Sequence, residues 1–67
     1  MISISINGAP RQLESAISIA DLVCEMGLEG KRIAIERNGE IAPRSQFSQQ
    51  MLQDGDKLEI VVAVGGG

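Results

Sequence analysis

The sequence predicts an α+β fold in which a mixed sheet of four to five strands carries one short helix on one face. Three observations lead to this: two alternating apolar stretches that each run into an Asn-Gly turn, a helical stripe between them, and a last alternating stretch near the C-terminal end. We place a single domain at residues 1–64 of the 67, followed by a flexible glycine tail at 65–67.

The first two predicted strands form a hairpin. Isoleucines at positions 2, 4 and 6 alternate with serines, which is typical of a half-buried strand with its apolar side chains on one face. Asn7-Gly8 follows, and both residues tolerate the positive φ angles of a tight hairpin turn. Because Pro10 cannot donate a ladder hydrogen bond, we expect a short return strand at about residues 11–13.

A helix of about two turns is predicted after this hairpin. Its apolar stripe has the i, i+3, i+4, i+7 spacing and consists of Ile19, Leu22, Val23 and Met26. Ser18 is the expected N-cap, and Asp21 falls in the first turn, where negative charge is favoured. Gly27 stands where a left-handed residue would end the helix.

The second hairpin is predicted from a pattern that begins near Lys31, with Ile33 and Ile35 on one face of a strand. Asn38-Gly39 is its turn, and the return strand begins at Ile41 and is cut off by Pro43. Residues 44–53 predict an irregular or single-turn segment that places Phe47, and either Met51 or Leu52, in the core.

The last strand follows an Asp54-Gly55-Asp56 turn. Its inward residues are expected to be Leu58, Ile60, Val62 and Val64. Its outward residues are Lys57, Glu59, Val61 and Ala63. The order strand, strand, helix, strand, strand, irregular turn, strand is that of a ubiquitin-like β-grasp roll.

Composition argues against several classes of protein. A net charge of −3 and a single aromatic residue, Phe47, are the opposite of what nucleic-acid binding by phosphate contacts and base stacking requires. One cysteine and no histidine exclude an internal disulfide and a Cys/His zinc site. No signal peptide and no apolar run long enough to cross a bilayer are present, so we expect a cytoplasmic protein.

Candidates for catalysis are weak, and we do not expect an enzyme. The pairs Asp54/Asp56 and Glu36/Glu40 could act as paired carboxylates, but each brackets a glycine turn and is interpreted as solvated. Cys24 lies off the apolar stripe, and Glu25 beside it would raise its pKa, so it is interpreted as incidental.

The glycine tail has two interpretations, a frayed end and a functional segment. Glycines need little space, and the three residues Gly65, Gly66 and Gly67 reach about 10 Å when extended. Such a tail could present the Gly67 carboxylate inside a partner's channel, where the partner would have to activate it. Val61 and Ala63 lie beside the tail on the outward face and are the expected partner surface.

Two internal motifs add a family resemblance. The segment 33–44 (IAIERNGEIAPR), the Asp54-Gly55-Asp56 turn and the diglycine end together resemble the ThiS family of ubiquitin-like sulfur carriers in thiamine biosynthesis. The resemblance implies that an E1-like adenylyltransferase, using ATP and Mg²⁺, activates Gly67. It also implies that a persulfide of the cysteine desulfurase or rhodanese type supplies sulfur, and that thiazole synthase accepts it. The chain itself would bind no cofactor.

Three alternatives remain open at this point. The small subunit of molybdopterin synthase has the same fold and the same thiocarboxylate chemistry with a different acceptor. A ubiquitin-like modifier would instead join Gly67 to lysines through isopeptide bonds. A non-catalytic interaction domain would have a tail of no importance.

Overall fold

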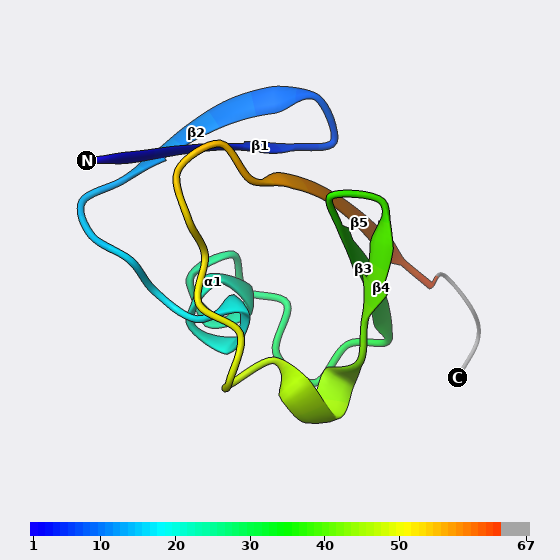
Figure 1. Cartoon of the computed structure of the whole chain (residues 1–67). Helices are drawn as coiled ribbons and strands as arrows, with labels where there is room; N and C mark the ends of the chain where they lie inside the picture. The colour runs from blue at the N-terminus through cyan, green and yellow to red at the C-terminus, as the bar shows by residue number, and fades with distance from the viewer. Residues whose placement is uncertain (64–67) are drawn as a thin grey trace.

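The computed structural model describes residues 1–63 and contains one five-stranded mixed sheet with α1 on one face (Figure 1). The strand order is β2-β1-β5-β3-β4. In chain order the elements are β1 Ile2–Ile6, β2 Ala9–Leu13, α1 Ile19–Glu25, β3 Ile33–Arg37, β4 Glu40–Ala42, the 3-10 helix η1 Arg44–Gln46 and β5 Lys57–Val62. The predicted fold class and element order are confirmed. Val64 and the glycines 65–67 lie outside the described residues.

The first hairpin has the predicted turn but a longer return strand. Asn7 and Gly8 have φ angles of 52° and 83°, which a two-residue hairpin turn of this hand requires. β2 begins at Ala9, so the expectation that it starts after Pro10 is wrong. Pro10 pairs with Ser5, whose backbone N–H donates to the backbone carbonyl of Asp56 at 3.0 Å on the other side of β1. The Pro10 nitrogen therefore faces away from β1 on an edge strand, where no donor is needed.

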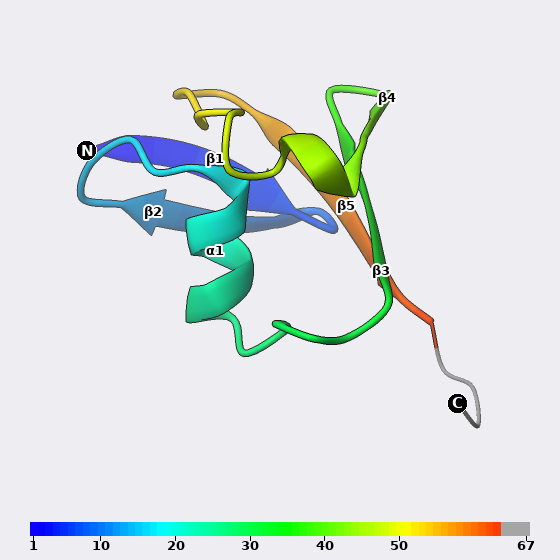
Figure 2. The same cartoon turned by 90° about the horizontal axis from the view of Figure 1, so that it is seen from below.

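β5 lies in the middle of the sheet, parallel to β1 and antiparallel to β3 (Figure 2). The asparagine side chain of each hairpin turn is hydrogen-bonded to this strand. Asn7 Oδ1 accepts from the Ile60 N–H at 2.8 Å, and its Nδ2 donates to the Ile60 carbonyl at 3.1 Å. Asn38 Oδ1 accepts from the Lys57 N–H at 2.9 Å. Both turns thus fix the register of β5, which the sequence pattern does not reveal.

α1 follows the predicted pattern. Ser18 is the N-cap, its Oγ accepts from the Asp21 N–H at 3.0 Å, and the Asp21 carboxylate accepts from the Ser18 N–H in return. The helix ends at Glu25, before Gly27 with a φ of 72°. No helix in the described part of the chain is long and apolar enough to cross a membrane.

The core lies between α1 and the inner face of the sheet. Its buried apolar residues are Ile4, Ile6, Leu13, Ile19, Leu22, Val23, Ile35, Ala42, Phe47, Leu52, Leu58 and Ile60. Of the two alternatives in the irregular segment, Leu52 is buried and Met51 is exposed, because the chain bridges to Ser18 there and directs alternate side chains inward. The predicted burial of Val62 is wrong: it is 38% exposed, at an end of β5 that pairs with β3 alone.

Candidate functional site

The described end of β5 places the predicted partner surface on the outer face of the sheet. Val61 is 63% exposed and pairs with the exposed Ala34 of β3, on the face that α1 does not cover. Ala63 is exposed too, and its N–H donates to the Arg32 carbonyl at 2.8 Å, so the ladder continues to the last described residue. The predicted site residues Gly65, Gly66 and Gly67 lie outside the described residues.

A shallow groove lies beside this strand end. We call it the Val61 groove; it has a volume of about 340 Å³ and is lined by Arg32, Ile33, Ala34, Arg44, Val61 and Ala63. Arg44 reaches it from η1, and its Nη2 donates to the Lys31 carbonyl in the loop before β3. The groove is thus lined by two arginines as well as by apolar side chains, which the sequence pattern did not indicate because the two arginines come from separate segments.

Asp56 is buried, so the interpretation of it as a solvated turn residue is wrong. Its Oδ2 accepts from Arg37 Nε at 3.0 Å and from the Gln53 N–H at 2.8 Å, and lies 2.8 Å from Arg37 Nη2. Its Oδ1 accepts from Asn38 Nδ2 at 3.0 Å. Arg37 Nη2 also donates to the Met51 carbonyl at 2.9 Å, which binds the irregular segment to the sheet.

The chemistry of Asp56 follows from this network. Burial alone would favour the neutral acid, but the hydrogen bonds from Gln53, Asn38 and Arg37, together with the Arg37 charge, outweigh it and lower the Asp56 pKa. A carboxylate held ionised by four donors is a structural anchor and a poor general acid. The remaining members of the two carboxylate pairs, Asp54, Glu36 and Glu40, are exposed.

Cys24 is exposed, as predicted, on the solvent side of α1. The Glu29 carboxylate, as a hydrogen-bond acceptor for the thiol and as a neighbouring charge, raises the Cys24 pKa most, followed by loss of solvation and the charges of Asp21 and Glu25. Glu25, which the sequence singled out, is thus the weakest contributor. Glu29 was missed because it lies beyond the turn at Gly27 and reaches Cys24 only in the folded chain. The thiol form is favoured, which does not suit a sulfur-transferring nucleophile.

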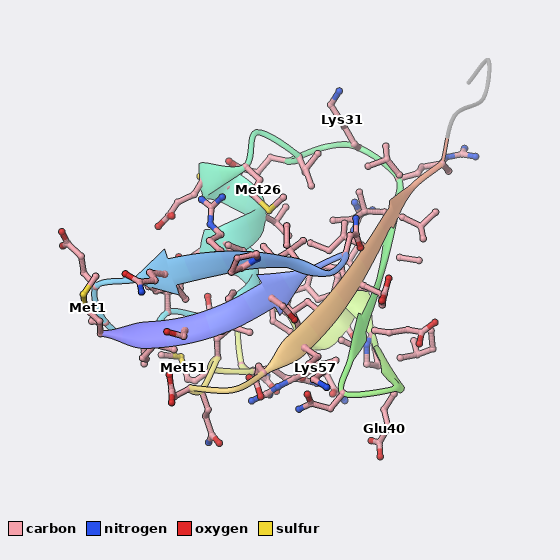
Figure 3. The ribbon with its side chains drawn as sticks, turned by 90° about the horizontal axis from the view of Figure 1, so that it is seen from above. Met1, Met26, Lys31, Glu40, Met51 and Lys57 are labelled. Atoms are coloured by element: carbon pink, nitrogen blue, oxygen red, sulfur yellow. The ribbon has the colours of Figure 1, made fainter. Side chains whose placement is uncertain are left out.

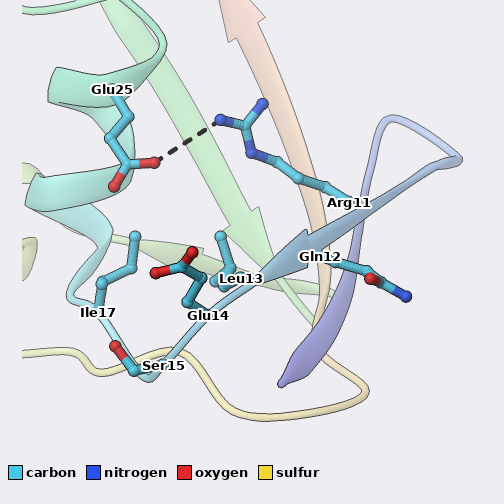
Figure 4. A pocket seen from close by; sticks show the side chains of 7 residues that line it. All are labelled: Arg11, Gln12, Leu13, Glu14, Ser15, Ile17 and Glu25. Carbon is cyan, nitrogen blue, oxygen red and sulfur yellow. Dashed lines mark ion pairs between the residues drawn. The ribbon is translucent and has the colours of Figure 1, made fainter.

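A second hollow lies between β2 and α1 (Figure 4). Arg11 and Glu25 form an exposed ion pair across it, with 3.8 Å between Arg11 Nη2 and Glu25 Oε1. No nucleophile or base lines it in a catalytic arrangement, and residues 1–63 contain no group of three His, Cys, Asp or Glu that could hold a metal ion.

Comparisons with known proteins agree with this geometry. The ThiS family model matches residues 4–67. The sulfur carrier protein ThiS of Thermus thermophilus is 36% identical over 62 residues, which cover 92% of this chain and 95% of that protein. A crystal structure of the thiamine biosynthesis protein ThiS from Geobacter metallireducens has a TM-score of 0.83 and 25% identity, over 98% of this chain and 100% of that one.

A longer relative is also similar. A thiazole synthase of Paramagnetospirillum magneticum is 44% identical over 62 residues, which are 92% of this chain. The chain spans only 19% of the length of that protein.

Proposed function

The chain belongs to the ThiS family and has its sulfur carrier role in thiamine biosynthesis, and from this premise we propose that the α-carboxylate of Gly67 carries the sulfur as a thiocarboxylate. The observation that carries the proposal is the position of β5. The central strand of the sheet reaches the outer edge of the fold at Ala63, and the sequence continues through Val64 into three glycines. The folded domain then provides the surface that a partner binds, while the glycines, which have no side chains, provide the segment that enters a narrow channel.

Activation requires a partner, because a carboxylate is a poor electrophile. An E1-like adenylyltransferase joins the Gly67 carboxylate to the α-phosphate of ATP, with Mg²⁺, and releases pyrophosphate. A protein persulfide, of the cysteine desulfurase or rhodanese type, then displaces AMP through its terminal sulfur. A second thiol attacks the resulting acyl disulfide, so that the thiocarboxylate leaves and a disulfide forms on the donor side.

Thiazole synthase is the proposed acceptor. Two proteins of that name contain a segment similar to this chain that makes up 19% and 20% of their length. A carrier segment within the same polypeptide as its acceptor is the arrangement that raises their effective concentration. The family match also favours this acceptor over the molybdopterin synthase that the sequence left open.

The chain is on this account a protein co-substrate. The two perturbed groups, Asp56 and Cys24, are an ionised anchor and a protonated thiol, so neither supplies acid, base or nucleophile. The exposed Val61 and Ala63 are proposed to contact the adenylyltransferase beside the channel that receives Gly65 and Gly66.

Pyrophosphate exchange tests the proposal. The 67-residue chain should support ATP–pyrophosphate exchange by the cognate adenylyltransferase, and a chain lacking Gly67 should not, since its carboxylate falls short by about 3.5 Å. A melting curve of the shortened chain serves as the control that it is folded. Equal exchange by both chains would overturn the assignment of Gly67.

A further inference from the structure

Positive charge on this acidic protein is concentrated at one end. Of its six Lys and Arg residues, Arg11 pairs with Glu25 and Arg37 pairs with Asp56. Figure 3 shows Lys31 at the end of the molecule where the described part of β5 ends, with Lys57 at the opposite end. Arg32 and Arg44 line the Val61 groove at the Lys31 end.

Both groove arginines have binding capacity to spare within residues 1–63. Neither arginine forms an ion pair within these residues. Of the two side chains, only that of Arg44 forms a hydrogen bond there, to the Lys31 carbonyl. That bond holds the Arg44 guanidinium beside the groove and leaves most of its five N–H donors for another acceptor. A fixed guanidinium binds a carboxylate with two parallel hydrogen bonds.

The outer face of the sheet changes sign along β5. Two residues before Val61 stands Glu59, which pairs directly with Glu36 of β3, and both are exposed. These two like charges stand directly opposite each other, and together they repel the acidic surface of a partner at this position. A partner with carboxylates is therefore disfavoured over the Glu36–Glu59 pair and favoured beside Arg32 and Arg44.

We infer that the Val61 groove binds an apolar side chain flanked by carboxylates at the mouth of the adenylyltransferase channel, with Arg32 and Arg44 as the residues that recognise those carboxylates. The inference rests on the proposed function and adds the chemistry of the partner surface. Val61 and Ala34 supply the apolar floor, and the two arginines line the same groove. A nucleic acid suits this groove less, because it has no aromatic side chain for stacking.

The test compares two double variants with the same change in net charge. Arg32→Gln/Arg44→Gln removes the groove cations, and Arg11→Gln/Lys57→Gln removes two cations elsewhere. Binding to the adenylyltransferase is titrated at low and high salt, and exchange kinetics are measured beside it. The groove variant should raise Kd and KM about five- to thirtyfold, as expected for two solvent-accessible ion pairs, with kcat within about twofold. The control should change Kd less than about threefold, and the difference should shrink near 1 M salt, where screening acts over about 3 Å.

Each other result has a definite meaning. Equal weakening by both double variants would show that net charge alone matters and would overturn the inference, as would a fall in kcat at unchanged Kd. Arg32→Gln alone, which breaks no side-chain hydrogen bond within residues 1–63, guards against misfolding and should weaken binding about two- to fivefold. A parent chain that binds without supporting exchange, while the groove variant binds more weakly than the control, would overturn the proposed function and support the groove. A parent chain that does not bind would overturn both.

Discussion

Replacing Asp56 with Asn is expected to destabilise the fold strongly while leaving the end of β5 unchanged. The substitution keeps the size of the side chain and removes its charge. Four donor groups surround the carboxylate: Nε and Nη2 of Arg37, the Gln53 N–H and Asn38 Nδ2. An asparagine must turn its NH₂ group towards either Arg37 and Gln53 or Asn38, so donor faces donor in both rotamers.

The magnitude follows from the burial of the pair. Removing one partner of a fully buried ion pair costs about 3 to 5 kcal/mol, because the other charge is left uncompensated. The Arg37 side chain is 21% exposed and the Asp56 side chain 8%, so water compensates part of this loss, and we expect about 2 to 4 kcal/mol. In a domain of this size each kcal/mol shifts Tm by about 4 to 8 °C, so Tm should fall by about 8 to 32 °C.

Urea unfolding at a series of pH values is the appropriate assay. The folded-state pKa of Asp56 lies below its ordinary value of about 3.8, so its ionised form stabilises the fold above that value. That contribution is lost as pH falls through the folded-state pKa. The parent and Asp56→Asn curves should therefore lie apart at neutral pH and converge below about pH 4.

Asp54→Asn is the matched control in the same turn. Asp54 is exposed, and its Oδ1 accepts from the Ser3 N–H at 2.7 Å, a bond that an amide oxygen can keep. We expect its free energy of unfolding to change by less than about 0.5 kcal/mol. An Asp56→Asn loss no larger than the control, or two curves that stay parallel down to pH 2, would refute the role given to this network.

Three further predictions concern the carrier function. Cys24→Ser should accept sulfur at Gly67 as well as the parent does, because the neighbouring Glu29 keeps the thiol protonated. A more than about tenfold loss of thiocarboxylate formation, measured by intact mass, would contradict this. Val61→Asp should weaken adenylyltransferase binding more than it lowers Tm, and a loss of binding explained wholly by unfolding would refute Val61 as a partner contact. Gly66→Val should change the free energy of unfolding by less than about 0.5 kcal/mol, yet the variant should be inert in pyrophosphate exchange. Near-normal exchange would show that the tail is only a frayed end.

The fold was predictable where local pattern and tertiary structure agree. The alternating isoleucines of β1, the helical stripe after Ser18 and the two Asn-Gly turns each depend on residues close in sequence. Pro10 was misjudged because its effect depends on which of its sides faces β1, and that is set by the hairpin register.

The burial of Asp56 was beyond local pattern for a different reason. A D-G-D turn predicts solvated carboxylates, and only the approach of Arg37 and Asn38, far away in sequence, converts one of them into an anchor. The Val61 groove is similar, because Arg32 and Arg44 are brought together by the bond to the Lys31 carbonyl. Sequence pattern finds the strand end and its exposed Val61, but not the charges that flank it.

The most direct test of the carrier account is the intact mass of the 67-residue chain after incubation with the cognate adenylyltransferase, ATP, Mg²⁺ and a protein persulfide. The account predicts a product heavier by the difference between one sulfur and one oxygen atom, with the change confined to the C-terminal fragment that ends at Gly67. Later addition of thiazole synthase with its other substrates should return the original mass. A chain whose mass is unchanged, or one that gains sulfur at Cys24 instead, would contradict the account.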